Sequence, residues 1–159
     1  MTTRTYGEYE PTLDEFKAHI RMTSYDLDDD LRIKLQASIR AAEHYIGAVI
    51  AQSDFVYEGP CVKTLILEAP VIGVSSVVVD NVTLTEDEWS LVGDKLIVKA
   101  EGSQMQVSYT AGMASVEPDI KAAVLLHAAA LFNNPVDSVE VLPKASTRLL
   151  DSYRSWRHR

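Results

Sequence analysis

The chain has 159 residues, of which 47% are hydrophobic and 24% are charged, and its formal net charge is -8. This length favours one domain, spanning residues 1–159, and the composition is that of a folded protein rather than a disordered one. Proteins that hold nucleic acid through its phosphates usually carry an excess of lysine and arginine, so the acidic balance argues against that class. The single cysteine, Cys61, excludes a disulfide framework within the chain.

Signals for secretion and membrane insertion are not found in the sequence. The N-terminus does not combine a basic segment, an apolar segment and a small-residue cleavage site, as a secretory leader does. The most apolar run, residues 120–132, is shorter than the roughly 20 residues that a membrane-spanning helix needs. We therefore expect a protein that is made in the cytoplasm and has no membrane partner.

Residues 12–51 are predicted to be helical. Residues 12–15 have the capping-box pattern, in which a threonine and a glutamate three residues later bond to each other's backbone amides, so a short helix should follow. The four aspartates among residues 26–30 should cap a second, longer helix through their side-chain oxygens and suit its positive dipole end. That helix is predicted to be amphipathic, because apolar residues recur at steps of three or four. These residues are Leu31, Leu35, Ile39, Ala42, Ile46 and Val49.

Residues 55–112 are predicted to form a small antiparallel β region. Short runs rich in β-branched residues are separated by turn residues, which is typical of strands joined by tight turns. The pairs Asp80-Asn81 and Gly93-Asp94 tolerate positive φ and should form two of these turns. The expected strands are residues 62–67, 74–79, 82–84, 96–98 and 105–109.

Residues 117–156 are predicted to be helical again. Pro118 suits the first position of a helix, where its absent amide would have no partner. Residues 120–132 are apolar on nearly every side of the helix, which predicts burial all round. Residues 133–135 should end this helix, and a short terminal helix should span residues 147–156. The predicted fold class is α+β, with N-terminal helices, a small central β region, a buried apolar helix and a short C-terminal helix.

The acidic segment before the long helix is a candidate metal site. Asp26, Asp28 and Asp30 match the first three side-chain ligands of a calcium-binding EF-hand loop. The sixth position of that loop should be glycine and the twelfth glutamate, but here they are Leu31 and Ala37. We therefore interpret the cluster as helix capping and expect no metal.

The histidines do not predict a metal or a catalytic site either. None lies at zinc-ligand spacing from another histidine or from Cys61. The four are His19, His44, His127 and His158. His127 lies in the apolar helix, and we interpret it as a core or subunit-interface histidine with one hydrogen bond.

Catalytic motifs are missing from the sequence. It contains no nucleophile elbow, phosphate-binding loop or dinucleotide fingerprint. Gly112 follows a predicted strand, but a single glycine at a distance from the next helix indicates a turn rather than a phosphate cradle. We therefore expect no enzyme and no cofactor. Two alternatives stay open, a small ligand-binding or regulatory module and a hydrolase that uses His127 with a nearby carboxylate.

The C-terminal segment is a candidate contact for a partner, because it gathers arginines while the rest of the chain is acidic. Trp156 lies between Arg154 and Arg157, and tryptophan and arginine are the residue types that dominate interface hot spots. A large aromatic residue at a chain end is also difficult to bury in its own core. The alternatives are a solvated basic terminus and a terminal helix that folds back over Trp156.

Six motifs follow one another along the chain. They are residues 13–21 with 45–47, residues 67–71 with 74–77, residues 89–91, residues 109–112, residues 116–123, and residues 142–143 with 149–154. In this order they resemble the head–tail connector (adaptor) proteins of long-tailed phages and related gene transfer particles, over residues 13–154. One departure is that the family often has an arginine shortly after the apolar helix, where this chain has Asn133-Asn134-Pro135.

The resemblance implies a structural virion protein of the neck, made in the host cytoplasm. It implies a ring of about twelve copies, placed between the portal and a tail-side stopper or completion protein. Double-stranded DNA would pass through the lumen without sequence-specific binding, and an acidic lumen agrees with the net charge. The C-terminal segment then becomes a candidate portal-docking arm, in which electrostatic complementarity orients docking. The residues of this arm are Arg148, Tyr153, Arg154, Trp156, Arg157 and Arg159.

Overall fold

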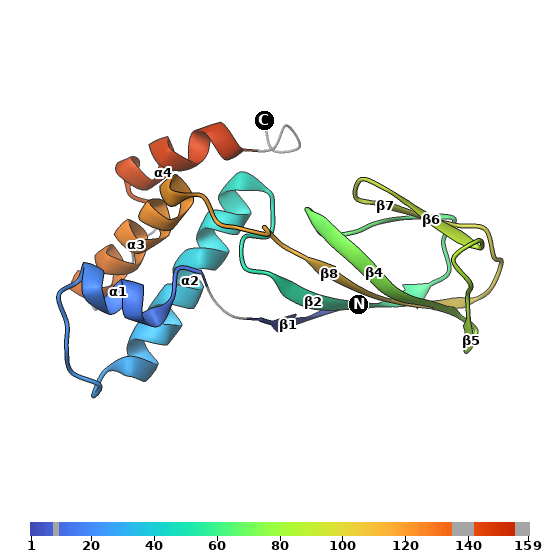
Figure 1. Cartoon of the computed structure of the whole chain (residues 1–159), viewed down its shortest axis with the longest axis horizontal. Coiled ribbons are helices and arrows are strands. Elements are labelled where there is room, and N and C mark those ends of the chain that lie inside the picture. The colour runs from blue at the N-terminus through green and yellow to red at the C-terminus, as the bar shows by residue number, and fades with distance from the viewer. Residues whose placement is uncertain (8–9, 135–141, 155–159) are drawn as a thin grey trace. The chain divides into compact units, whose positions relative to one another are not determined.

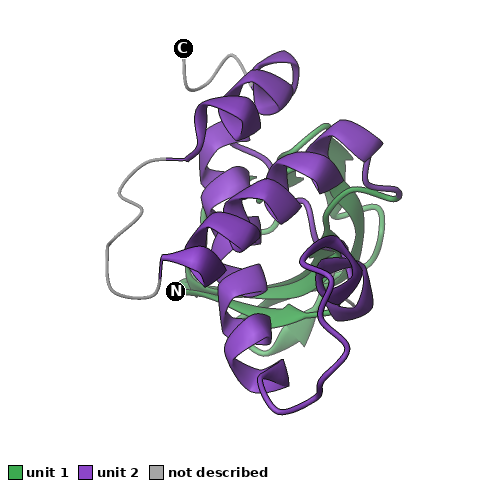
Figure 2. Cartoon of the chain, turned by 90° about the vertical axis from the view of Figure 1, so that its left-hand side faces the viewer, with its two compact units in different colours: residues 1–7, 52–114 green, residues 8–51, 115–159 purple. Residues whose placement is uncertain are grey.

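The computed structural model describes residues 1–7, 10–134 and 142–154 (Figure 1). Within these residues the fold is α+β, as predicted, with four α-helices and two antiparallel sheets. The chain divides into two compact units (Figure 2). Residues 1–7 and 52–114 form the β unit, and residues 8–51 and 115–159 form the helical unit. The single domain expected from the length stays a prediction. No helix in the described ranges is long and apolar enough to cross a membrane.

The larger sheet of the β unit has the strand order β1-β2-β8-β4-β5, and neighbouring strands are antiparallel. Its strands are β1 (Thr2–Tyr6), β2 (Ser53–Pro60), β8 (Gln104–Ala111), β4 (Val71–Val79) and β5 (Val82–Thr83). The turn between β4 and β5 contains Asp80 and Asn81 with φ of 46° and 67°, which confirms the predicted turn. Among residues other than glycine, Asn and Asp are two of the types that most readily adopt this backbone conformation.

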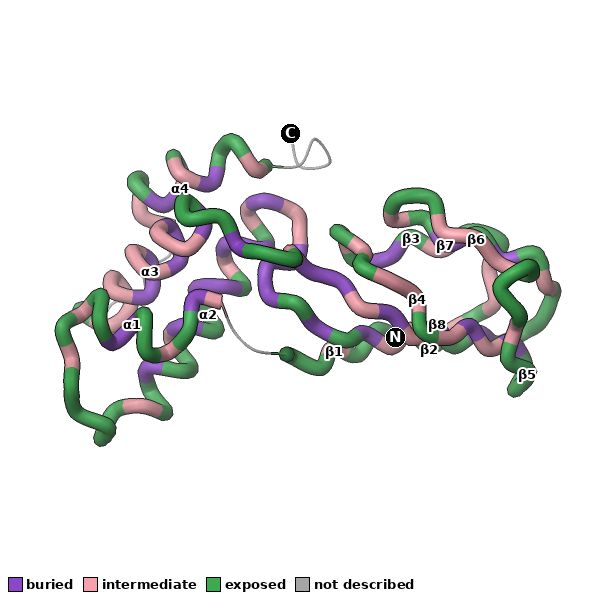
Figure 3. Tube along the Cα trace, in the orientation of Figure 1, coloured by how far each residue is buried: buried purple, intermediate pink, exposed green. Residues whose placement is uncertain are grey.

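The smaller sheet has the order β3-β7-β6. Its strands are β3 (Thr64–Ile66), β7 (Lys95–Val98) and β6 (Trp89–Val92). Gly93, with φ of 63°, lies in the predicted turn between β6 and β7. Figures 1 and 3 show this sheet over one face of the larger sheet, and the alternation of buried residues along the strands agrees with two facing apolar layers. The buried residues are Phe55, Val77, Val79, Leu96, Val98, Met105, Val107 and Tyr109.

The helical unit consists of α1 (Leu13–His19), α2 (Asp28–Ile46), α3 (Pro118–Asn133) and α4 (Lys144–Leu150), followed by a 3-10 turn (Asp151–Tyr153). The capping box is confirmed, because the Thr12 hydroxyl accepts from the Glu15 amide at 3.2 Å and the Glu15 carboxylate accepts from the Thr12 amide at 2.8 Å. The long helix ends at Gly47, whose φ of 71° suits a residue without a Cβ.

The core of the helical unit lies where α3 packs against α1, α2 and α4. The predicted apolar stripe of α2 is confirmed from Leu31 to Ile46, whereas Val49 is buried but lies beyond the end of the helix. Removing this apolar surface from water is the main favourable term in folding the unit. The largest buried side chains are Phe16, Leu31, Ile39, Ile46, Ile50, Ile120, Val124 and Leu150.

Three predictions for the helices were wrong. The N-cap of α2 is Leu27, with no side-chain cap, because the nearby Asp28 carboxylate binds the Lys17 ammonium at 2.8 Å instead. The apolar helix α3 is not buried all round: its packing partners cover one side, and residues 129–132 are only half-buried. The terminal helix begins earlier than predicted, at Lys144, and its α-helical part ends at Leu150.

The β prediction was incomplete. The five expected strands occur with different bounds, but three strands, β1, β2 and β6, were missed, and β2 begins at Ser53, before the expected β region. The sequence of β1 is Thr-Thr-Arg-Thr-Tyr, which does not alternate apolar with polar residues, so its side-chain pattern does not mark a strand. Its register against β2 is set by the partner strand, as in Thr3 opposite Val56.

Candidate interaction surfaces

The described part of the predicted portal-docking arm is fastened to the helical unit. Arg148 is exposed on α4, Tyr153 is half-buried in the 3-10 turn, and Arg154 is exposed directly after it. The other three residues of the arm, Trp156, Arg157 and Arg159, lie outside the described residues. Arg148 is thus the residue of this arm whose side chain projects from a regular helix.

A cluster of Tyr45, Asp151 and Arg154 joins the end of this arm to α2. The Tyr45 hydroxyl donates a hydrogen bond to an Asp151 carboxylate oxygen at 2.5 Å, and this bond raises the pKa of Tyr45. The Arg154 guanidinium lies 5.1 Å from the centre of the Tyr45 ring, within the range of a cation–π contact. The described part of the arm is therefore held against α2 up to Arg154.

Tyr153 belongs to the same end of the helical unit. Burial raises the pKa of its hydroxyl, and the nearby carboxylates of Asp119 and Glu117 raise it further. Both carboxylates belong to the start of α3, since Glu117 is the N-cap and Asp119 is in the first turn. The half-buried side chain of Tyr153 thus lies near the start of α3, within the helical unit.

The open face of the larger sheet is a second candidate surface, which the sequence analysis did not identify. Residues of β8 alternate, with Met105, Val107 and Tyr109 buried on one face and polar residues on the other. Cross-strand hydrogen bonds order the polar face. They join Thr110 to Asp54 at 2.7 Å and Gln106 to Glu58 at 2.9 Å. The polar alternation from Gln104 to Thr110 was the sequence signal for this face.

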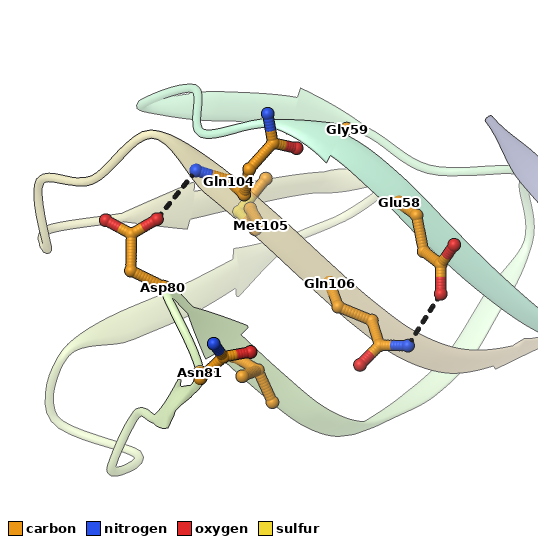
Figure 4. Close-up of a pocket in the computed structure, with 8 residues that line it drawn as sticks. Glu58, Gly59, Asp80, Asn81, Gln104, Met105 and Gln106 are labelled. Carbon is orange, nitrogen blue, oxygen red and sulfur yellow. Dashed lines mark hydrogen bonds between the residues drawn. The ribbon is translucent and has the colours of Figure 1, made fainter.

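One end of this face forms an open groove of about 460 Å³ (Figure 4). Its lining residues are Glu58, Gly59, Val78, Asp80, Asn81, Gln104, Met105 and Gln106. The Asp80 carboxylate accepts hydrogen bonds from the amides of Gln104 at 2.9 Å and Ser103 at 3.0 Å. These bonds lower the pKa of Asp80, so it carries a negative charge at neutral pH. The groove presents carboxylate and amide groups, which suit a polar or basic partner better than an apolar ligand.

The outer face of the smaller sheet is a third candidate surface. Ile66, Val92 and Ile97 lie on it with exposed fractions of 60%, 61% and 38%. The strand register places Ile66 and Val92 on either side of Lys95, on the face opposite the buried Leu96. Grouped exposed aliphatic residues on one face are typical of contact surfaces.

His127 does not have the surroundings of a catalytic base. It is buried, its burial lowers its pKa, and its Nδ1 atom has no hydrogen-bond partner among the described residues. A catalytic imidazole is usually oriented by a carboxylate bound to one ring nitrogen. The described part of the chain also holds no group of three potential metal ligands.

Comparisons with known proteins place this fold. No family model matches the sequence, and no curated protein matches it. Three solved structures share the fold over 98% of this chain and 95% of theirs. One is the neck of an empty gene transfer agent particle computed with C6 symmetry, with a TM-score of 0.78 and 20% identity. The second is the neck of the native particle computed with C12 symmetry, with a TM-score of 0.76 and 20% identity. The third is the virion of the native particle, with a TM-score of 0.75 and 21% identity.

Proposed function

We propose that this chain is a structural subunit of a particle neck, a head–tail connector located between the portal and a tail-side stopper or completion protein. The observation that supports this best is the fold shared with gene transfer agent neck structures over nearly the full length of both chains. The order of motifs over residues 13–154 supports the same class independently. Two fold-wide similarities that agree on one kind of particle are stronger than any single short motif.

The proposed subunit assembles into a ring of about twelve copies, in keeping with the C12 symmetry of one similar neck. A ring is built from heterologous contacts, in which one patch of a subunit meets a different patch of the next and the rotation closes. Each copy therefore needs at least two unlike contact surfaces. The outer apolar face of the β unit, with exposed Ile66, Val92 and Ile97, is one surface suited to such a contact.

Double-stranded DNA is proposed to pass through the lumen of the ring. The β unit has nine acidic residues and four basic ones, so most of the net charge of the chain belongs to it. Acidic residues on a lumen surface repel phosphates and keep DNA from adhering. Asp54 and Glu58, exposed on the open sheet face, have the required sign.

The portal-docking arm is proposed to act through its exposed cations. Arg148→Glu should weaken portal binding because it reverses a charge that complements an acidic portal surface. Lys144→Glu is the matched control, since it makes the same charge change on the exposed side of the same helix. Equal loss for both variants would show that only net charge matters, and no loss for Arg148→Glu would remove this residue from the docking surface.

The role is proposed to be structural and not catalytic. If His127 were the base of a hydrolase, His127→Ala would abolish turnover and leave assembly intact. Under the structural proposal the same variant damages folding or assembly, because it leaves a space in the core of the helical unit. His127→Leu is the control, because it fills the space without a titratable group.

Light scattering tests the whole proposal. The purified chain is measured alone and after mixing with its cognate portal. A stoichiometric complex with a defined number of copies is expected. A chain that stays monomeric and does not bind the portal would contradict the connector proposal. Stabilisation of such a monomer by a small molecule would instead favour a ligand-binding module.

A further inference from the structure

The larger sheet of the β unit ends in two strands that are only partly paired. β1 has β2 on one side and is the last strand of the sheet on the other. At the opposite end, β5 pairs with β4 only at Val78 and Val79. On the same edge of β4, opposite the edge that pairs with β8, residues Val71 to Ser76 pair with no strand of the described chain.

From these two edges we propose that neighbouring copies share one continuous antiparallel sheet, in which β1 of one copy pairs with the Val71–Ser76 edge of β4 in the next. The inference rests on the proposed ring, because it assigns the contact between adjacent copies. It names a second copy of this chain as the partner of both edges.

Strand direction is the first argument. Adjacent strands are antiparallel in the order β1-β2-β8-β4, so β1 and β4 run in opposite directions. When a second copy is placed beside the first in the same orientation, its β1 therefore arrives antiparallel to β4. An even number of full-length strands is needed for this result, because three or five would give a parallel junction. Copies added side by side in the same orientation therefore extend one antiparallel sheet, and no subunit has to be inverted. A ring with heterologous contacts requires this common orientation.

Length is the second argument. β1 has five residues, and the Val71–Ser76 stretch has six. The short β5 pairs with the remaining end of β4, and the Leu84 amide bonds to the Val77 carbonyl at 2.8 Å. An incoming β1 would run in the same direction as β5 and lie in line with it. The two would together cover the whole length of β4.

Preorganisation of β1 is the third argument. The Arg4 guanidinium donates to the Ser53 hydroxyl at 3.0 Å and lies 4.3 Å from the Tyr6 ring centre and 5.4 Å from that of Phe55. The Gly7 amide also bonds to the Gln52 carbonyl at 3.2 Å. A strand already held in the extended form loses less conformational entropy when it binds a partner.

Two bulges in β4 explain why this edge would not pair indiscriminately. The register against β8 shifts between Val71 and Gly73 and between Val74 and Ser76, which leaves Ile72 and Ser75 without a counterpart. Bulges are among the devices that keep sheet edges from aggregating. We therefore expect the contact to form only when the portal holds copies side by side.

Disulfide trapping tests the contact. If the incoming β1 follows the same residue pairing on β4 as β8 does, Thr5 lies beside Gly73 and Thr3 lies beside Ser76, on the polar face. Cys61 is first replaced by serine. Thr5→Cys and Gly73→Cys are then combined in one chain, since no atom lies within 4 Å of a Cβ built at Gly73. Thr3→Cys with Ser76→Cys is the second pair, and the matched control is Thr5→Cys with Ser108→Cys, which puts the second thiol mid-sheet.

Oxidation with the portal present should give a ladder of covalent multimers for each of the two edge pairs. The control pair, and each of the four edge cysteines introduced alone, should give no covalent multimers. Dimers from Thr5→Cys alone would mean that two β1 strands pair with each other, which overturns the proposal. The molar mass of each reduced variant mixed with the portal is also measured by light scattering. A ring of normal copy number without cross-links in either edge pair overturns the shared sheet and leaves the connector function standing. Failure of the Cys61→Ser chain itself to form a ring overturns both.

Discussion

The helical unit and the β unit use their polar groups differently. In the helical unit, the Lys17 ammonium binds Asp28 at 2.8 Å, and the Glu43 carboxylate, buried in the core, accepts from two backbone amides. In the β unit, Asp54 and Glu58 are exposed on the open face of the larger sheet, where they accept hydrogen bonds from neighbouring side chains. Internal polar contacts stabilise the unit that makes them, whereas an ordered open face is suited to contacts with other molecules. The difference shows that polar side chains are used within the helical unit for internal contacts and are left exposed on one face of the β unit.

The largest expected effect comes from the interior of the helical unit. Phe16→Ala should lower the free energy of unfolding by about 3–5 kcal/mol, because it removes a fully buried ring and leaves a cavity. The measurement is denaturant unfolding followed by helical circular dichroism. The matched change on the open face, Gln106→Ala, should cost less than about 0.5 kcal/mol. Similar losses for the two variants would break the proposed division between stabilising interior and open face.

A smaller effect is expected at Glu43. Its carboxylate accepts from the Ile50 amide at 2.9 Å and the Ala51 amide at 3.3 Å, where the chain leaves α2. Glu43→Ala should lower the free energy of unfolding by about 1–3 kcal/mol, because buried donors lose their acceptor. Glu43→Gln keeps an acceptor oxygen and should cost clearly less in the same unfolding assay. If the two variants are equally destabilised, charge and not hydrogen bonding is what the core requires.

The first turn of α1 gives the next effect. Thr12→Ala removes one half of the capping box and should cost about 1 kcal/mol. Thr12→Ser keeps the hydroxyl and serves as the control in thermal unfolding. A Thr12→Ala midpoint equal to that of Thr12→Ser would show that the cap contributes nothing to the unit as a whole.

The helical unit was easier to predict from the sequence than the β unit. Helix starts are local signals, so Thr12 and Pro118 were assigned from their neighbours in the chain. The stop at Gly47 was not identified from the apolar pattern, and the predicted stripe was carried past it to Val49. The exposed side of α3 could not be assigned, because its composition is apolar throughout and only its packing partners decide which side they cover.

The β unit depends on partners that are distant in sequence. The pairing of β1 with β2 joins residues about fifty positions apart, and the bulges in β4 appear only when it is aligned with β8. The candidate surfaces differ in the same way, because one is local in sequence and the other is built from distant strands. The basic C-terminal segment could be read from sequence, whereas the groove near Asp80 required knowing that β2, β4 and β8 are neighbours.

The smallest expected effect concerns Asp80 and its dependence on pH. Hydrogen bonds from the Gln104 and Ser103 amides lower the pKa of Asp80 in the folded chain. A carboxyl group whose pKa is lower in the folded than in the unfolded state adds stability above its unfolded pKa, and that stability is lost as the pH falls through the folded pKa. Asp80→Asn should therefore lower the melting temperature slightly at about pH 7.

The difference between Asp80→Asn and the unchanged chain should shrink on acidification and vanish once Asp80 is protonated. Melting curves from about pH 7 down to about pH 2 measure it, and the subtraction removes the parallel contributions of Glu15 and Glu88, whose pKa values are also lowered. Asn81→Gly is the control, because it changes the same turn without removing a titrating group and should act equally at every pH. A deficit for Asp80→Asn that persists at acid pH would mean that the turn geometry, and not the charge on Asp80, holds this end of the open face in place.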